Sequence, residues 1–165
     1  MFKIGDYVVK PNTGICRIED IVFMSLVGKE KKQYYVLLPI DDDRAKLYVT
    51  TDADRTRLRP VMTTDESREF IKRIADIEAV WVPNDKMREQ QYKEAFKTNE
   101  PESLVAIIKN LYSRSQIRIA QGKKVTSTDE KYYKQAEKAL YSELAFSLGV
   151  EMEEIINKVA GLITK

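Results

Sequence analysis

The first 62 residues alternate short apolar runs with clusters of turn-forming residues, a pattern typical of a small β domain. The run Tyr7–Val9 is followed by Lys10–Gly14, which combines Pro, Asn, Thr and Gly. Later runs of the same kind predict further strands at residues 15–24, 33–38, 46–50 and 58–61. Five short strands in so few residues indicate a strongly bent sheet or a Tudor/SH3-like barrel.

The longest predicted strand, residues 15–24, alternates imperfectly between apolar and polar positions. Strict alternation would place Ile15, Ile21 and Phe23 on one face, and Ile18 and Met24 on the other.

From residue 63 onward the apolar positions recur with the period of a helix. A first helix is predicted with Thr64 or Asp65 as its N-cap, because short polar side chains accept hydrogen bonds from the first free amides. The apolar positions of this helix should dock on a core. They are Phe70, Ile71, Ile74 and Ile77.

Breaks at 83–85, at 98–101 and at the basic loop Gln121–Val125 divide the rest of the chain into further helices. These helices are expected at about 84–97, from 101 onward, from 127 to 148, and at about 151–164. Ser127 and Glu130 have the spacing of a capping box, and Gly149 should close the long helix. The expected core residues include Met87, Tyr92, Ala95, Phe96, Leu104, Ile107, Ile108, Leu111, Tyr133, Ala136, Leu140, Leu144 and Leu148.

The chain is therefore expected to have an α+β fold with two domains. Its 165 residues are enough for two small units. A five-stranded Tudor/SH3-like domain should span residues 1–62, and an all-α domain of about five helices should span residues 63–165.

The composition excludes most catalytic and metal chemistry. There is no histidine and a single cysteine, Cys16, so the chain lacks the commonest general base, a Cys/His zinc site and an internal disulfide. None of the six glycines belongs to a phosphate-binding loop. The acidic cluster Asp41–Asp43 is better explained as a solvated turn between strands than as a cation site. We expect no enzyme activity, no cofactor and no bound metal.

No apolar run approaches the roughly 20 residues that span a bilayer, and the N-terminus lacks an apolar signal region. The protein is therefore expected to be cytoplasmic and to have no membrane partner. In a reducing compartment, Cys16 is expected to serve as a small buried hydrophobic residue.

The net charge is only +2, but the basic residues are unevenly distributed. Residues 84–126 contain nine Lys/Arg against five acids, a surplus of four, whereas 63–83 and 127–165 each come out at minus two. A clustered surplus is the electrostatic pattern that favours nucleic-acid binding.

Landmarks along the whole chain resemble those of the CarD/CdnL family of RNA polymerase-binding transcription regulators. The opening Phe2–Val9, followed by Pro11 and Gly14, is similar to the start of that family, and Gly28–Leu38 is similar to its hairpin. Their order along the chain makes the resemblance specific. The landmarks of the helical half are Leu111-Tyr112-x-Arg114-x-Gln116, Ser127-x-x-Glu130-Lys131 and Glu143-Leu144-Ala145.

The resemblance implies a bacterial transcription regulator with two binding domains. The Tudor-like domain would bind the β subunit of RNA polymerase. The helical domain would contact promoter DNA at the upstream edge of the transcription bubble and stabilise the open complex. Through RNA polymerase the protein would be associated with the nucleoid.

The resemblance assigns DNA contact to basic residues of the helical half, whose charges can pair with phosphates. The alternative is that these are ordinary solvated helix charges, because Glu89 and Glu94 are interspersed among them. Phosphate and minor-groove contacts with weak sequence selectivity and strong salt dependence are expected. The expected DNA-binding residues are Lys86, Arg88, Lys93, Arg114, Arg118, Lys123, Lys124 and Lys131, together with Trp81.

The single tryptophan departs from the family pattern. Members of the family carry a tryptophan directly after the asparagine that opens this helix, as an apolar wedge against the minor groove. Here Asn84 is followed by Asp85, and Trp81 lies three residues earlier, between two valines. Trp81 is therefore either a core or interdomain anchor, or a displaced DNA wedge.

On the polymerase side, the resemblance assigns contact to strand edges around residues 23–26 and 46–49. An exposed edge offers unpaired backbone groups to a partner strand. Basic residues of some relatives are replaced here by Met24 and Tyr48, which implies a more apolar interface. The alternative is that these side chains form core, and the sequence leaves Tyr48 open. The expected polymerase-binding residues are Met24, Leu26, Leu47 and Tyr48.

The competing interpretation is a Tudor/SH3-like protein-binding adaptor whose helical domain binds a protein rather than DNA. An enzyme is the least supported class, because no nucleophile, base and orienting group can be assembled from this sequence.

Overall fold

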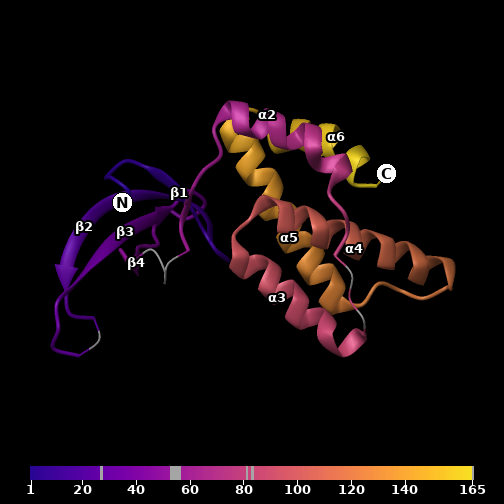
Figure 1. Cartoon of the computed structure of the whole chain (residues 1–165), viewed down its shortest axis with the longest axis horizontal. Helices are drawn as coiled ribbons and strands as arrows, with labels where there is room; N and C mark the ends of the chain where they lie inside the picture. Colours follow the sequence, from indigo (N-terminus) through magenta and orange to yellow (C-terminus); the bar gives the residue numbers. More distant parts are fainter. Residues whose placement is uncertain (27, 53–56, 81, 83, 165) are drawn as a thin grey trace. The chain divides into compact units, whose positions relative to one another are not determined.

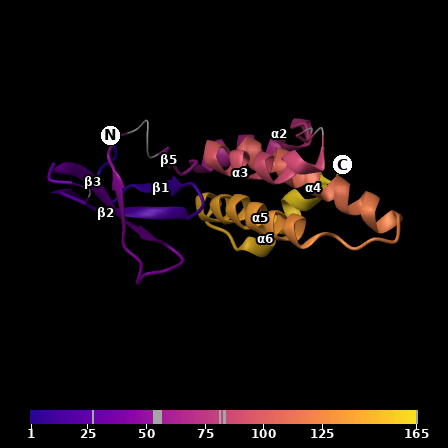
Figure 2. The ribbon, with the colours of Figure 1, turned by 90° about the horizontal axis from the view of Figure 1, so that it is seen from below.

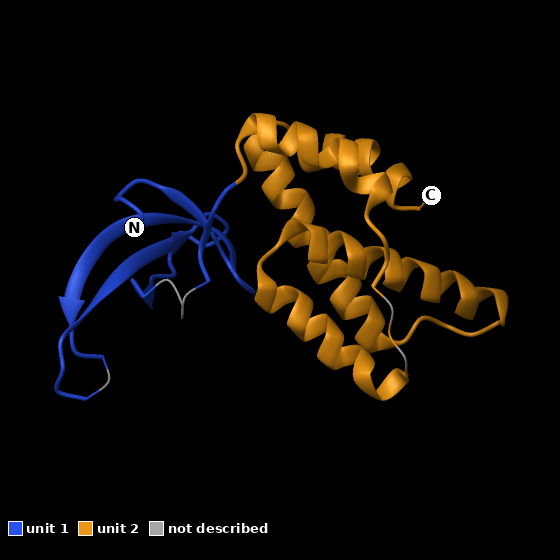
Figure 3. Cartoon of the chain, in the orientation of Figure 1, with its two compact units in different colours: residues 1–61 blue, residues 62–165 orange. Residues whose placement is uncertain are grey.

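The chain divides into two compact units, Met1–Val61 and Met62–Lys165, each with a hydrophobic core of its own (Figure 3). The computed structural model describes residues 1–26, 28–52, 57–80, 82 and 84–164. A β unit followed by a helical unit confirms the predicted α+β class.

The first unit is an antiparallel five-stranded sheet in the order β4-β3-β2-β1-β5 (Figures 1 and 2). Its core lies on one face and is formed by Val8, Cys16, Ile18, Tyr35 and Leu37. Because β4 pairs with β3 alone, it forms one edge of the sheet. The strands are β1 (Tyr7–Lys10), β2 (Gly14–Met24), β3 (Lys32–Pro39), β4 (Leu47–Thr50) and β5 (Arg59–Pro60).

A bulge in β2 explains the imperfect alternation of its sequence. Ile18 pairs with Leu37, but the next pair joins Asp20 to Val36, so β2 contains one extra residue at this point. Beyond the bulge the two faces are exchanged, and Ile21 packs on the same core as Ile18. The expected assignment of these two side chains to opposite faces is therefore wrong.

Cys16 is buried in this core, as expected for a structural cysteine. Burial raises the pKa of its thiol to about 11, so the side chain stays protonated at neutral pH.

The second unit is a bundle in which α5 contacts each of the other long helices. Its helices confirm the predicted periodicity, and the C-terminal part of α4 extends beyond its neighbours before the chain returns to α5 (Figures 1 and 2). The helices are α2 (Thr64–Arg73), α3 (Arg88–Thr98), α4 (Pro101–Ala120), α5 (Ser127–Leu148) and α6 (Met152–Ile163), with short 3-10 turns η1 (Ile74–Asp76) and η2 (Asp85–Met87).

Two predicted helix starts are each wrong by one or two residues. Thr63 caps α2 in a reciprocal capping box with Glu66, and Thr126 caps α5 by accepting a hydrogen bond from the Asp129 amide. The sequence offers overlapping cap patterns in both places. In α5 the Asp129 amide donates to Thr126, while the Asp129 side chain turns inward to Tyr92 and Arg114.

Met87 is a further correction, since it was expected in the core and its side chain is 44% exposed. It belongs to the 3-10 turn η2 rather than to α3. Its position therefore does not follow the helical spacing that places Tyr92 and Phe96 in the core.

Lys109 is buried although it contributes to the basic surplus of the sequence. Its ammonium group donates hydrogen bonds to the carbonyl oxygens of Ile74 at 2.7 Å and Ala75 at 3.3 Å, and to that of Ile77. These carbonyls belong to η1 and the residue after it, and that of Ile74 also accepts the Ile77 amide at 3.2 Å. The lysine thus fastens the end of the first helical segment to α4 and is not available to a ligand.

Replacing this lysine should destabilise the helical unit. We expect Lys109→Met to lower the free energy of unfolding by about 2–4 kcal/mol, because buried carbonyl acceptors lose their donor. Urea denaturation of the full chain measures the loss. The exposed Lys72→Met change on α2 is the matched control and should shift the free energy by less than about 0.5 kcal/mol. Equal values for the two variants would contradict the assigned role.

Candidate nucleic-acid and protein interfaces

A buried polar cluster joins α3, α4 and α5 beneath the basic segment of the second unit. The Arg114 Nε atom lies 2.8 Å from Asp129 Oδ2, and the Tyr92 hydroxyl donates to Asp129 Oδ1 at 2.9 Å. Both oxygens of this carboxylate are therefore satisfied, and its side chain is only 7% exposed. A paired and hydrogen-bonded charge is the form in which a carboxylate can be buried.

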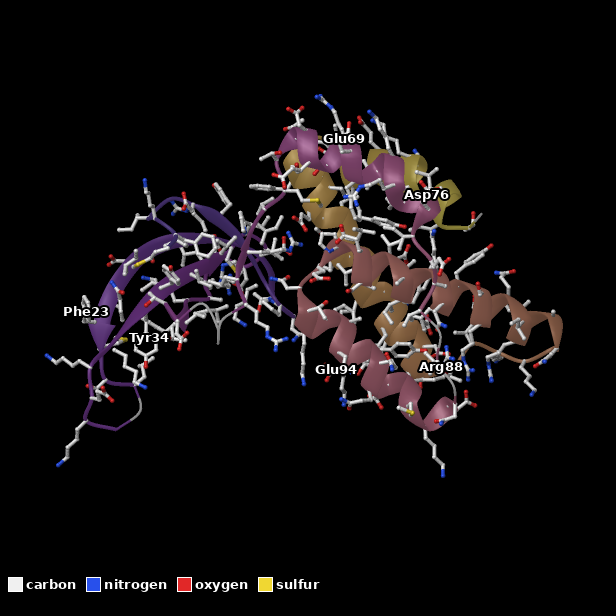
Figure 4. All side chains as sticks on the ribbon, in the orientation of Figure 1. Phe23, Tyr34, Glu69, Asp76, Arg88 and Glu94 are labelled. Carbon is white, nitrogen blue, oxygen red and sulfur yellow. The ribbon has the colours of Figure 1, made fainter. Side chains whose placement is uncertain are left out.

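The cluster extends to the chain segment before α3. Arg88 donates to the Tyr92 hydroxyl at 3.0 Å and to Asn110 Oδ1 at 2.8 Å. Asn110 in turn donates to the Val80 carbonyl, and the Val80 amide bonds to the Ala106 carbonyl. Arg88, at the start of α3 in Figure 4, is thus part of the internal framework.

The electrostatics of the cluster keep Tyr92 neutral and Arg114 charged. Burial raises the pKa of the Tyr92 phenol to about 12, and its hydrogen bond to Asp129 acts in the same direction. Burial alone would lower the pKa of Arg114, but the hydrogen bond and charge of Asp129 outweigh it and raise that pKa. The outer side of the Arg114 guanidinium contacts Asp85, whose Oδ1 lies 3.1 Å from an Arg114 terminal nitrogen.

The expected DNA-binding residues fall into two classes. Arg88, Arg114 and Arg118 are half-buried and hold structure together. The second class consists of exposed lysines. Two of them make local contacts, since Lys93 pairs with Glu89 and Lys131 lies over the Tyr132 ring. The members of this class are Lys86, Lys93, Lys123, Lys124 and Lys131.

Arg118 organises the basic loop at the tip of α4. Its Nε donates to the Lys124 carbonyl at 2.8 Å, while the Lys123 amide bonds to the Arg118 carbonyl. Gly122 has a φ of 73° at this turn, which favours glycine over other residues. The loop therefore presents two exposed lysines from a fixed backbone. Trp81 lies outside the described residues, so its role stays a prediction.

The outer face of the β sheet carries apolar and aromatic side chains. Cross-strand pairing places Val22 beside Tyr34, and Asp20 and Val36 beside Tyr48, on the face opposite the core. Tyr48 is 46% exposed at the edge strand, which answers the question that the sequence left open. Phe23 and Tyr34, labelled in Figure 4, lie near the end of the β2–β3 hairpin.

The other residues expected at the polymerase contact differ in exposure. Leu26 is 50% exposed and Met24 is half-buried, whereas Leu47 packs against the core of the sheet. At the edge of the sheet, Leu47 therefore offers its backbone groups rather than its side chain to a partner. Tyr34 was not singled out from the sequence, although the alternation of residues 33–38 contains its position.

Two family models match consecutive parts of the chain. Residues 2–62 match the CarD-like/TRCF RID domain, and residues 72–160 match the CarD C-terminal domain. The chain belongs to the CarD/CdnL family. No curated protein is significantly similar to it in sequence.

Membership in the CarD/CdnL family sets the general role of the chain. The family consists of non-enzymatic transcription regulators that interact with RNA polymerase, and its RID domain is Tudor-like, in agreement with the five-stranded sheet. Within the described ranges, no group of three His, Cys, Asp or Glu side chains is placed to hold a metal ion. Of the helices in the described part of the chain, none is both long and apolar enough to cross a membrane.

The raised pKa of Tyr92 predicts a loss of stability at high pH. An unfolded phenol loses its proton near its ordinary pKa of 10, while the folded one keeps it to about pH 12. The unfolded state therefore binds fewer protons in this window, and the free energy of unfolding falls as pH rises. In Tyr92→Phe the slope from pH 10 to 12 should be shallower by up to about 1.4 kcal/mol per pH unit.

Urea denaturation of both proteins from pH 7 to 12 measures this difference. Below pH 9 the two curves should run parallel, with the variant lower by about 1–3 kcal/mol because Asp129 loses a donor. Curves that stay parallel up to pH 12 would contradict the assigned contact.

Proposed function

We propose that this CarD/CdnL protein binds the β subunit of RNA polymerase through the edge of its sheet and contacts promoter DNA through its helical unit. By touching DNA at the upstream edge of the transcription bubble, it modulates the stability of the open complex. The succession of the two matched family domains along one chain is the observation that carries this proposal.

The edge strand β4 supports the polymerase contact. It pairs on one side with β3 and leaves its other side open to a strand of a partner. Tyr48 stands exposed on this strand, and an aromatic side chain at a strand edge supplies the kind of anchor that dominates protein interfaces. Leu26, in the connection between β2 and β3, is a further exposed apolar side chain of this unit.

The exposed lysines of the helical unit support the DNA contact. Lys86 lies in η2, and Lys123 and Lys124 stand on the braced tip of α4. Ammonium groups on a fixed backbone pair with phosphates without reading bases, so binding should be weakly selective and should fall steeply with salt. With Asp85 after Asn84, the wedge of the family is absent at its usual position, and Trp81 stays either a displaced wedge or a core or interdomain anchor.

Removing the edge tyrosine should weaken the polymerase contact. We expect Tyr48→Ala to reduce binding to the isolated β subunit at least about tenfold, in the range of an interface hot spot. Calorimetry or co-purification measures this loss, and thermal unfolding should be unchanged because the side chain is exposed. The matched control is Tyr7→Ala, which removes a similarly exposed tyrosine from β1. Unchanged binding by Tyr48→Ala would reject the assignment.

Neutralising the α4 tip should weaken binding to duplex DNA. In Lys123→Ala/Lys124→Ala, the slope of log affinity against log salt should fall by about 0.9 for each phosphate that the protein no longer neutralises. Fluorescence anisotropy with arbitrary duplexes measures the slope. Lys31→Ala/Lys32→Ala, which removes two adjacent exposed lysines from the β unit, is the matched control. Equal slopes for wild type and this variant would show that the tip of α4 does not contact the DNA phosphates.

The open complex links the two contacts in one experiment. Its lifetime on a promoter is measured with the cognate polymerase, with and without the protein. A lifetime that the wild type does not change would contradict the proposed function as a whole.

A further inference from the structure

Arg114 is held between two carboxylates that differ sharply in exposure. Asp129, on its inner side, is 7% exposed and receives a second hydrogen bond from Tyr92. Asp85, on its outer side, is 78% exposed. The guanidinium-bearing side chain of Arg114 is 24% exposed, so it is partly open to solvent at the Asp85 side.

The inner contact is permanent because breaking it would leave charge buried without a partner, which typically costs about 3–5 kcal/mol. The outer contact is a single exposed ion pair, a kind that contributes about 0–1 kcal/mol. An incoming anion can therefore displace Asp85 at small cost, while Asp129 keeps the guanidinium in place.

Asp85 is also dispensable for the local fold. The cap of η2 is supplied by Asn84, whose side-chain oxygen accepts a hydrogen bond from the Met87 amide at 3.1 Å. Among the described contacts, the Asp85 side chain takes part in the ion pair with Arg114 and not in the cap. Its departure from Arg114 would leave the start of α3 capped.

Carboxylate and phosphate oxygens are equivalent acceptors for a guanidinium group. We propose that Asp85 is an internal phosphate mimic: it masks Arg114 in the free protein and is replaced there by a phosphate of duplex DNA. The proposal rests on the DNA contact proposed above and names the residue that regulates it. Lys86, exposed and adjacent to Asp85, would pair with the same strand.

Masking lowers the affinity of the free protein for DNA in general. A partner that holds the protein beside the duplex raises the effective DNA concentration and can drive the exchange on Arg114. Asp85 thus weakens the binding of the protein to DNA at sites where no polymerase holds it.

The test compares two Asp→Asn variants of the full chain that remove the same charge. Asp85→Asn frees Arg114, whereas Asp65→Asn frees Arg68 of α2, whose terminal nitrogen lies 3.6 Å from that carboxylate. Affinity for a fluorescein-labelled duplex is measured by anisotropy over a series of salt concentrations. Asp85→Asn should bind about 3- to 5-fold tighter than wild type, with a salt slope steeper by about 0.9, and Asp65→Asn should change affinity less than about twofold.

A second set of variants tests whether Arg114 is the cation that Asp85→Asn exposes. In Arg114→Gln/Asp129→Asn the buried pair becomes a neutral amide pair, which avoids stranding a charge, and circular dichroism checks its fold. Adding Asp85→Asn to this background should give no gain in affinity. If the background does not fold, the difference in salt slope between Asp85→Asn and Asp65→Asn decides alone.

The outcomes separate the mask from the function on which it rests. Wild-type binding that depends steeply on salt, with Asp85→Asn no tighter than Asp65→Asn, overturns the mask and leaves the DNA contact standing. A gain that persists without Arg114 also overturns the mask. Absence of duplex binding by every variant at low salt overturns the DNA contact, and the mask with it.

Discussion

The ion pair between Arg114 and the buried carboxylate of Asp129 is the polar contact that joins the helices of this unit. A carboxylate can be buried only if its oxygens are paired, and Tyr92 fills the second oxygen of Asp129. Because these groups come from α3, α4 and α5, the geometry of the pair fixes the three helices relative to one another. The same pair orients Arg114 so that its outer nitrogen meets Asp85.

Two more buried polar side chains join other segments of this unit through hydrogen bonds. Lys109 holds the carbonyls at the end of the first helical segment, and Glu143 accepts the Met62 amide at 3.0 Å. Arg114 and Glu143 are also among the residues by which the sequence resembles the CarD/CdnL family. Two landmarks of the helical half, Arg114 and Glu143, therefore make polar contacts that hold segments of this unit together.

In the β unit, the register of strand pairing decides which side chains face the core. The bulge in β2 lets Ile18 and Ile21 pack on one core although they are three positions apart, and it leaves Val22 and Tyr34 on the outer face. A strand without the bulge would send one of the two isoleucines to solvent. The apolar outer face and the open edge of β4 thus follow from how the strands pair.

The sequence by itself determined the class of the fold, most of the core and the family. Periods of two and of 3.6 residues distinguish strand from helix because burial selects every side chain on one face. Those periods placed Ile107, Leu140 and Leu144 in the core, where they lie. They could not separate basic residues that face solvent from those that serve the interior, because Lys109, Arg114 and Lys123 look alike along the chain.

Only the tertiary structure shows which basic side chains face solvent and which serve the interior. Whether a charge is buried depends on which carboxylates and carbonyls other segments bring to it, and Asp129 lies 15 residues from Arg114 while Ile74 lies 35 from Lys109. Local spacing specifies the elements, and contacts distant in sequence assign their polar side chains to framework or to surface.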